Sequence, residues 1–460
     1  MKLKNILTSK NINIFAWATL IVVVFASIFI RSPFGFFDEQ VHYVRSIGIS
    51  NGQLLGYSKE SDNSKFGHDI DKSNEEYVNV YQGSGIEPVS LDWLNDIRGT
   101  NKDSSDDEYV LNTSAAPYMP VSYFPYAIAA SLAHLFNFDM RSELILMRLF
   151  GAITALGIVF AAFKLSPKKY KWTILAIALI PMCISAFAAI TTDGFTIAVS
   201  LLFMATILRM VERIQEKELN NKDIAILAVA SLLVVAAKMP TFLIIALILG
   251  VIIVFWKKIN KKQKIYLFSI IGISAIITLL WAWYVKDINT GAYWSRNTDT
   301  MEQLKFIISH PVMFTKNLIY SMLNYDFSNI IYNLYANNSF YTSLPFVVDI
   351  VILIGVALSS FVGIQQPKPT KNQIKIYWVQ VILFLIASIA IFTLLYLQFT
   401  PVGTLNKIDG VQPRYFLPFI PLLVMIPYVF KLSKYWRVFT YIAPFIGVSV
   451  YLIYIIMQLI

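Results

Sequence analysis

The chain has 460 residues, of which 57% are hydrophobic and only 14% are charged, and it carries a formal net charge of +10. Soluble domains are usually about 25% charged and 45–50% apolar, so this composition excludes an ordinary soluble protein. The apolar residues fall in runs of about 20, long enough for a helix to cross a hydrocarbon layer of about 30 Å. The positive charge lies mainly in short links between these runs, which indicates membrane topology and not a nucleic-acid-binding surface.

The first apolar run, residues 13–30, follows Lys2, Lys4 and Lys10. It is longer than the apolar region of about 7–15 residues in a signal peptide, and no small-residue cleavage motif follows it. We therefore interpret residues 1–30 as a cytoplasmic amino terminus with a first, retained membrane span.

The next segment, residues 31–142, is expected to be a large extracytoplasmic loop. Residues 31–117 contain 15 Asp and Glu against 7 Lys and Arg, a net charge of 7 − 15 = −8, whereas cytoplasmic loops are rich in Lys and Arg. Residues 118–136 are apolar enough to span, but they contain Pro120 and Pro125 and are rich in the Tyr and Phe that favour the interface. We expect an interfacial helix there, with a true span as the alternative.

The rest of the chain is expected to form a transmembrane bundle at 143–285, a second extracytoplasmic loop at 286–345 and carboxyl-terminal spans at 346–460. Lysine-rich links should be cytoplasmic, and they lie at 164–171, 257–264, 365–375 and 431–437. Keeping these links inside gives spans at 13–30, 143–163, 172–190, 192–211, 223–237, 241–256, 265–285, 346–364, 376–397, 415–431 and 437–458. The sequence thus predicts an all-α polytopic membrane protein with eleven transmembrane helices, or twelve if the interfacial stretch also crosses.

The stretch FDEQVHYVRSIG, residues 36–47, follows the first span at the predicted outer face. It places Asp38 four residues before His42, so a short helix would bring both side chains to one face, with Glu39 beside them. Asp38 is also a suitable N-cap residue, and helix capping is the alternative to a functional role.

Three more charged residues map to the same outer face. Asp193 lies at a very short outer turn, Lys238 lies at the next outer turn before Pro240, and Arg414 lies at the entrance of the span at 415–431. Capping is the alternative for Asp193, and snorkelling is the alternative for Lys238. A charged residue that lies near the hydrocarbon layer of the membrane is a candidate functional residue by default. We therefore predict one site in which the bases bind a phosphate and a carboxylate accepts a proton from a hydroxyl.

Other chemical motifs are absent from the sequence. It has no P-loop, no dinucleotide-binding glycine motif and no HExxH, and its four histidines form no metal-binding pattern. No cofactor is required by any motif. Asp38 and Asp193 are the candidate ligands if a divalent cation such as Mg²⁺ or Mn²⁺ takes part.

These residues resemble the signature of domain-of-unknown-function family 2142, a family of bacterial membrane proteins. The resemblance rests on an Asp-Glu-x-x-His-aromatic motif, a K-x-P motif and a Q-x-R-Y-x-x-P motif, in that order along the chain. The matching residues are Asp38, Glu39, His42, Tyr43, Lys238, Pro240, Gln412, Arg414, Tyr415 and Pro418. Phe37 and Pro413 stand where the family usually has proline and glycine, and neither change removes a polar candidate.

That family in turn resembles glycosyltransferase superfamily C, whose members use lipid-linked sugars. The resemblance implies inverting transfer of a sugar from a polyprenyl-phosphate donor to an extracytoplasmic cell-envelope glycan acceptor, in the bacterial plasma membrane. It assigns catalysis to Asp38, as general base, and Glu39. It assigns substrate binding to His42, Asp193, Lys238, Gln412, Arg414 and Tyr415.

Two other classes of function stay open at this point. A polysaccharide polymerase or ligase of a different fold would also need a large outer loop. A glycolipid transporter or flippase would use the outer charges as a headgroup site, but it should also carry polar residues along its spans. Few such residues occur, although Asp349 lies near the start of the span at 346–364.

Overall fold

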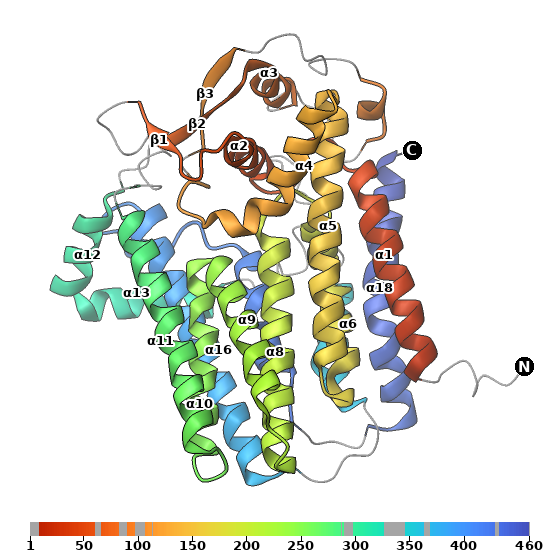
Figure 1. Cartoon of the computed structure of the whole chain (residues 1–460), viewed down its shortest axis with the longest axis vertical. Coiled ribbons are helices and arrows are strands. Elements are labelled where there is room, and N and C mark those ends of the chain that lie inside the picture. Colours follow the sequence, from red (N-terminus) through yellow and green to blue (C-terminus); the bar gives the residue numbers. More distant parts are fainter. Residues whose placement is uncertain are drawn as a thin grey trace, which may run out of the picture.

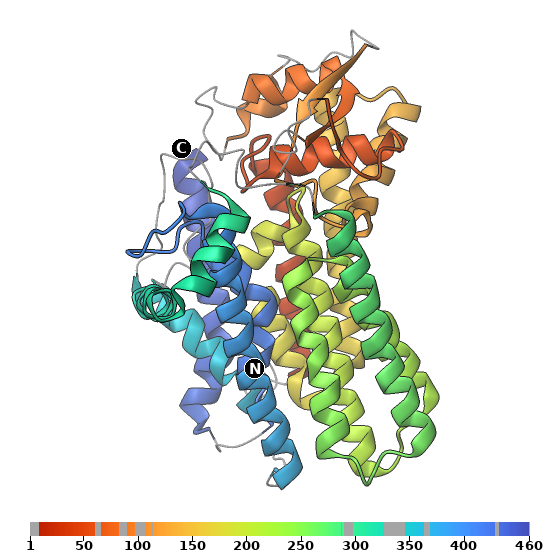
Figure 2. The same ribbon diagram turned by 90° about the vertical axis from the view of Figure 1, so that its left-hand side faces the viewer.

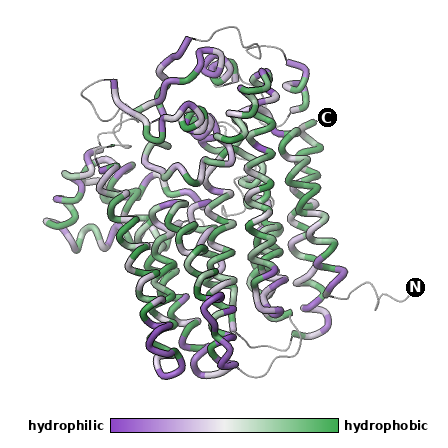
Figure 3. Tube along the Cα trace, viewed as in Figure 1, coloured by the Kyte–Doolittle hydropathy of each residue, from purple (hydrophilic) through white to green (hydrophobic). Residues whose placement is uncertain are grey.

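The chain folds into an upright helical bundle with a mixed cap of helices and strands at one end (Figure 1). The computed structural model describes residues 9–59, 66–81, 90–96, 106–112, 114–286, 288, 298–325, 346–362, 369–427 and 432–459. Hydrophobic residues dominate the middle of the bundle, and polar residues gather in the cap and at the opposite end (Figure 3). This distribution is that of a multi-pass membrane protein.

Within the described residues, six helices are long and apolar enough to cross a membrane. They are α1 (Ser9–Ile30), α5 (Met140–Leu165), α8 (Thr192–Glu216), α11 (Lys261–Tyr284), α16 (Lys371–Phe399) and α18 (Lys434–Leu459). Four of them begin beside a polar side chain that accepts from a free backbone N–H of the first turn. These N-caps are Asp139, Thr191, Asn260 and Thr370.

The other five predicted spans are broken or shorter helices. The span predicted at 172–190 divides into α6 (Lys171–Ala178) and α7 (Pro181–Phe187), bent by 77° where Pro181 begins the second helix. The rest are α9 (Asn221–Ala236), the 3₁₀ helix η5 (Met239–Ile245) with α10 (Ala246–Val254), α15 (Phe346–Leu358) with η7 (Ser359–Phe361), and η8 (Pro413–Phe419) with α17 (Ile420–Val424).

The count of eleven crossings therefore stays a prediction. With the bent pair taken as one span, the described residues hold seven candidates. The shorter helices do not reach the length of about 20 residues that one helix needs to cross alone.

Helix α8 lies at the centre of the bundle. In the most apolar 18-residue segment of α8, 94% of the residues are buried, whereas 17% are buried in the corresponding segment of α11 at the periphery. Helix α8 packs against α5, α7 and α9. At its first turn a Cβ on Gly194 would lie 2.5 Å from the carbonyl oxygen of Ala186. Glycine therefore allows the start of α8, where Asp193 lies, to pack closely against α7.

The cap contains a small sheet that the sequence reasoning did not predict. Strands β1 (Tyr57–Ser58), β2 (Phe66–Asp71) and β3 (Asp107–Leu111) pair antiparallel in the order β1-β2-β3. Helices α2 (Glu39–Ser50) and α3 (Lys72–Tyr81) and the 3₁₀ helix η2 (Asp92–Leu94) complete this part. The chain is mostly helical, as predicted, but the cap is not purely so.

A buried network joins α2 to this sheet. Arg45 donates from Nη1 to Nε2 of His68 at 2.7 Å. Since Arg has only donors, Nε2 must accept, and the proton on Nδ1 is donated to Oδ1 of Asn112 at 3.0 Å. Burial lowers the pKa of His68 to about 4, which keeps this ring neutral near pH 7. The network fixes α2 against β2.

The apolar stretch at 118–136 forms the 3₁₀ helix η3 (Pro120–Tyr123) and α4 (Phe124–Leu135) in the cap. The twelve residues of α4 rise about 18 Å, too little to cross the hydrocarbon layer. It packs against α5 and α2 and leaves Ile128 and Leu135 exposed. These properties favour the interfacial interpretation over a twelfth span.

The second predicted outer loop, 286–345, contains α12 (Thr300–Ser309) and α13 (Pro311–Leu323). The two helices lie at one side of the bundle, and one of them is seen end-on in Figure 2. Gln303 anchors α12, because its Nε2 donates to the carbonyl oxygen of Tyr396 and its Oε1 accepts from the N–H of Gly403. Residues 287, 289–297 and 326–345 of this loop lie outside the described residues.

Candidate functional site

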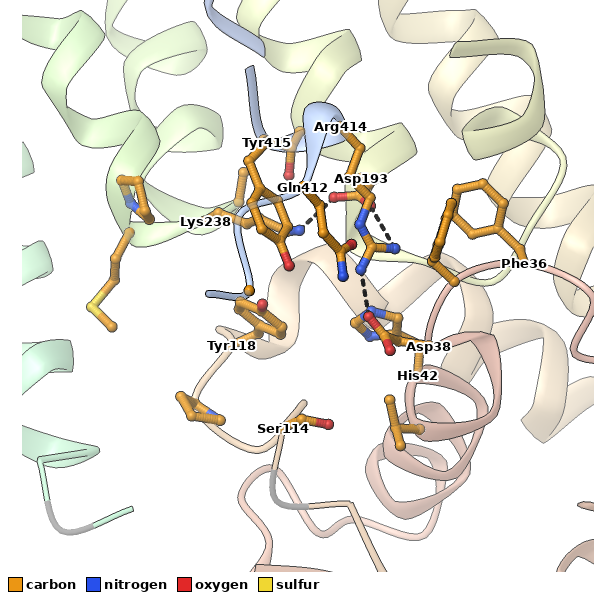
Figure 4. A pocket seen from close by; sticks show the side chains of 18 of the residues that line it. Phe36, Asp38, His42, Ser114, Tyr118, Asp193, Lys238, Gln412, Arg414 and Tyr415 are labelled. Atoms are coloured by element: carbon orange, nitrogen blue, oxygen red, sulfur yellow. Dashed lines mark hydrogen bonds and ion pairs between the residues drawn. The ribbon is translucent and has the colours of Figure 1, made fainter. Parts of the chain in front are cut away.

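A cavity of about 760 Å³ lies between the cap and the bundle. Its wall is formed by the turn before α2, the segment before η3, the loop between α9 and η5, the end of α16 and the start of η8. Part of this wall is apolar and includes Val235, Leu394 and Phe399. Charged and polar side chains converge on the other part (Figure 4), among them Asp38, His42, Asp193, Lys238, Gln412, Arg414 and Tyr415.

Asp38 immediately precedes α2 and has left-handed backbone geometry, with φ 56°. Asp and Asn tolerate this conformation better than most other residues do. Its side chain makes no capping hydrogen bond to α2; it faces the cavity, and 44% of its surface remains accessible. The predicted short helix with Asp38 and His42 at its start is therefore present, but the capping alternative for Asp38 is wrong.

Arg414 connects two acids of the cavity, Asp38 and Asp193. Its Nη2 donates to Oδ2 of Asp38 at 2.5 Å, and its Nη1 lies 3.6 Å from Oδ2 of Asp193. The guanidinium stacks over the ring of Phe37, 4.6 Å from the centroid, an arrangement that favours a cation. Only 4% of the Arg414 side chain is exposed, so this charge is held by its neighbours and not by bulk water.

Lys238 forms the second ion pair of the cavity, since its Nζ donates to Oδ1 of Asp193. Asp193 lies in the first turn of α8, where the free N–H groups and the helix dipole favour a carboxylate. The ammonium group lies 5.3 Å from the ring centroid of Tyr118 and 5.6 Å from that of Tyr415. Asp193 thus holds Lys238 between two aromatic rings, and neither simple capping nor snorkelling describes these residues.

Acids and bases are nearly balanced around the cavity. Asp38 and Asp193 face Lys238 and Arg414, and Asp409 adds a third acid to the wall. His42 adds no charge near pH 7, because burial lowers its pKa to about 4; its Nδ1 is 2.7 Å from the hydroxyl of Tyr123. Burial raises the pKa of Asp38, but the charge of the Arg414 guanidinium and its hydrogen bond to the carboxylate oppose this, and the net pKa lies below the ordinary value. Asp38 is therefore ionised at neutral pH.

Several polar atoms around Arg414 are buried without a hydrogen-bond partner among the described residues. They are Nε and Nη1 of Arg414 and Oε1 of Gln412. Leaving a buried polar group unsatisfied costs about 1–3 kcal/mol, and more for a charged group. These atoms mark the place where polar atoms of a ligand would complete the site.

A divalent cation does not fit this arrangement. In the part of the chain that the structure describes, no group of three or more His, Cys, Asp or Glu side chains could hold a metal ion. The two candidate ligands, Asp38 and Asp193, both use oxygens to pair with Arg414, and Asp193 also pairs with Lys238. A cation would have to displace these bases, so the acids are described better as their counter-ions.

A family model described as predicted membrane protein (DUF2142) matches residues 20–423 of the chain. The chain belongs to the DUF2142 family. The matched range includes all the charged residues of the cavity, and the family description agrees with the multi-pass fold. No curated protein and no solved structure is significantly similar to the chain.

In this DUF2142 protein, Glu39 does not line the cavity, which does not favour its predicted catalytic role. Arg148 donates from Nε to Oε1 of Glu39 at 2.9 Å and from Nη2 to Oε2 at 2.8 Å, and both side chains are fully buried. Oε1 also accepts from the N–H of Ile190 at 3.0 Å. Because both oxygens are occupied, Glu39 ties α2 to α5 and to the turn before α8, and it cannot reach a substrate.

Arg148 is the important residue that the sequence reasoning missed. Besides its pair with Glu39, it donates to three backbone carbonyls, that of Ile28 in the last turn of α1 and those of Arg31 and Ser32 in the turn that follows. It therefore fixes the segment that presents Asp38. The available signal was an arginine inside the predicted span at 143–163, whose other charged residue is Glu143 at its first position. A charge within a span is a reason to look for a buried partner of opposite charge.

Proposed function

We propose that this chain is a membrane glycosyltransferase that moves a sugar from a polyprenyl-phosphate donor to an extracytoplasmic glycan acceptor, with inversion at the anomeric carbon. The chemistry is the one implied by the likeness to superfamily C. The observation that carries the proposal is the presence of Lys238 and Arg414 in one cavity whose wall is partly apolar.

This combination suits a lipid-linked phosphate because it offers both an anion site and an apolar path. Arg414 retains Nε and Nη1 as donors without a hydrogen-bond partner among the described residues, although Nη1 lies 3.6 Å from Oδ2 of Asp193. Charge-assisted bonds from Arg and Lys to phosphate are the strong ones. Trp281, Leu394 and Phe399 line the same cavity and would contact the first isoprene units. A soluble anionic substrate would have no use for that apolar wall.

In the proposed reaction, an acceptor hydroxyl oxygen bonds to the anomeric carbon while the bond from that carbon to the phosphate oxygen breaks. Asp38 takes the hydroxyl proton, and the bonding electron pair leaves with the phosphate. Oδ2 of Asp38 contacts Arg414, which leaves Oδ1 for the acceptor. Its low pKa keeps Asp38 ionised, the state that a general base requires.

The bases stabilise the charge that develops on the departing phosphate. Asp193 orients Lys238, and His42, neutral and held by Tyr123, forms part of the polar wall beside the acceptor position. Gln412 contributes Oε1, which is unpartnered and can accept from a sugar hydroxyl. Each of these proposed roles is consistent with the contacts of the described residues.

Binding of polyprenyl phosphate is the first test of this proposal. Purified protein in nanodiscs would be titrated with polyprenyl phosphate alone, for the wild type and for Arg414→Gln and Lys238→Met. Loss of one charge-assisted hydrogen bond, about 1.5–3 kcal/mol, should weaken binding about 10- to 100-fold. Arg213→Gln is the matched control, since Arg213 pairs with Glu218 near the other end of α8, and it should bind like the wild type.

Acceptor-dependent release of polyprenyl phosphate is the second test, made with a panel of polyprenyl-phosphate-linked sugars. Release together with formation of a glycoside supports the transferase. Movement of the intact donor across a vesicle membrane without release would identify a flippase. Absence of polyprenyl-phosphate binding in the folded wild type would overturn the proposal.

A further inference from the structure

A second cavity, of about 50 Å³, lies at the end of the bundle far from the cap. In Figure 1, α5 runs from the cap down to this end, where the 3₁₀ helix η4 (Lys168–Tyr170) follows it. The cavity is lined by Lys169 of η4, Leu208 and Glu212 of α8, and Gln380 of α16. Nothing in the proposed transfer reaction uses this region.

Lys169 is unusual because its charged end is buried and makes no ion pair with any residue that the structure describes. The side chain is 7% exposed, and Nζ has no hydrogen-bond partner among the described residues. Nζ lies 5.0 Å from the centroid of the Tyr170 ring. Lysine is almost never buried unpaired, because removing an ammonium group from water costs several kcal/mol.

Gln380 provides a second unsatisfied atom in the same wall. It is 1% exposed, and its Oε1 has no hydrogen-bond partner in the described part of the chain. The cavity therefore combines a cationic donor with a neutral acceptor. Glu212 also lines it, but among the described residues no ion pair joins Glu212 to Lys169, whose Nζ has no hydrogen-bond partner. Water molecules could satisfy the hydrogen bonds of both groups, but they would not neutralise the charge of Lys169.

The surroundings favour an anion. Lys164, Lys168 and Lys171 lie in the same link, 164–171, which contains no acidic residue. The link is predicted to be cytoplasmic, and the lipid surface of that leaflet is negatively charged. A volume of about 50 Å³ is several times the roughly 10–15 Å³ that one water molecule needs, so it accommodates a group about the size of phosphate.

We propose that this cavity binds a phosphate group, to which Lys169 donates from Nζ, while Oε1 of Gln380 accepts from a hydroxyl of the same ligand. Two sources carry this chemistry. One is the headgroup of an anionic phospholipid with free hydroxyls, such as phosphatidylglycerol, and the other is free phosphate.

The test uses thermal melting of the full-length protein in detergent, with added short-chain phosphatidylglycerol, short-chain phosphatidylcholine or inorganic phosphate at constant ionic strength. Lys169→Met removes the buried charge, and Lys168→Met removes an exposed charge one residue away. Phosphatidylglycerol should raise the melting temperature of the wild type and of Lys168→Met. The concentration for half the effect should be about 10- to 100-fold higher in Lys169→Met.

Inorganic phosphate that reproduces the same pattern would identify free phosphate as the ligand, whereas an effect confined to phosphatidylglycerol identifies the headgroup. Equal losses in Lys168→Met and Lys169→Met would overturn the proposal, because diffuse surface charge would explain them. If Lys169→Met fails to fold, native mass spectrometry of the wild type from mixed-lipid nanodiscs decides. Retention of phosphatidylglycerol over phosphatidylcholine supports the site, and equal retention overturns it.

Discussion

Replacing Asp38 by Asn separates a general base from a structural residue, because the substitution removes a charge and changes little else. Asn is nearly isosteric with Asp, and it tolerates the left-handed φ of 56° equally well. The side chain of Asp38 makes no capping hydrogen bond to α2, so no cap is lost. The backbone that presents this position is fixed elsewhere, by the buried pair of Glu39 and Arg148.

The expected loss of stability is small. The Asp38 side chain is 44% exposed, but its partner Arg414 is only 4% exposed, and a buried charge left without a partner is costly. Arg414 keeps Asp193 at 3.6 Å as a counter-ion, and the amide oxygen of Asn can still accept from the guanidinium. Turnover should nevertheless fall by about 10²–10⁴-fold, the usual contribution of a general base.

Asp139→Asn is the matched control for this substitution. Asp139 caps α5, accepts from the N–H of Ser142, and pairs with Arg141 at 3.4 Å, and it does not line the cavity. Both variants would be measured for acceptor-dependent release of polyprenyl phosphate and for melting temperature. Wild-type turnover in well-folded Asp38→Asn, or an equal loss in Asp139→Asn, would refute the assignment of Asp38 as the base.

Three further predictions concern stability and topology. Glu39→Gln breaks a fully buried ion pair, so the free energy of unfolding should fall by about 3–5 kcal/mol in denaturant melts; a loss below about 1 kcal/mol contradicts its structural role. His42 and His68 have a folded-state pKa of about 4 against about 6.5 when unfolded. In this pH range the unfolded chain therefore binds more protons than the folded chain. The free energy of unfolding should fall as the pH drops from about 6.5 towards 4, by up to about 1.4 kcal/mol per pH unit for each ring. A melting temperature that stays constant between about pH 7 and pH 5 argues against this. In intact cells an impermeant maleimide should label Lys72→Cys in the cap but not Lys168→Cys, and the reverse pattern would invert the topology.

Charge and hydropathy in the sequence were sufficient to locate the helices of the bundle, because long apolar runs have few alternatives to a helix in a membrane. The bend between α6 and α7 was not predicted, although Pro181 lies within the run at 172–190. The sheet was missed because β2, FGHDID, is short and largely polar. Its pairing depends on β3, about 40 residues further along the chain, and not on a local pattern.

The sequence predicted which residues belong to the candidate site, but not which of them form ion pairs with one another. The predicted membrane topology was enough to assign four charged residues to one face of the membrane: Asp38, Asp193, Lys238 and Arg414. The choice between Asp38 and Glu39 could not be made from sequence, since neighbouring residues point in different directions and tertiary contacts decide which one enters the cavity. Here Arg148 of α5 takes up Glu39, and the left-handed backbone of Asp38 turns its carboxylate towards Arg414.

A density map of the wild-type protein with polyprenyl phosphate bound is the most direct measurement of the proposed site. The phosphate is predicted to lie within hydrogen-bond distance, about 3 Å, of both Lys238 Nζ and the Arg414 guanidinium, with the first isoprene units along Leu394 and Phe399 of α16. A phosphate bound away from both bases, with the ion pairs of Asp38 and Asp193 undisturbed and the cavity closed to lipid, would contradict the assignment of this cavity to a lipid-linked sugar donor.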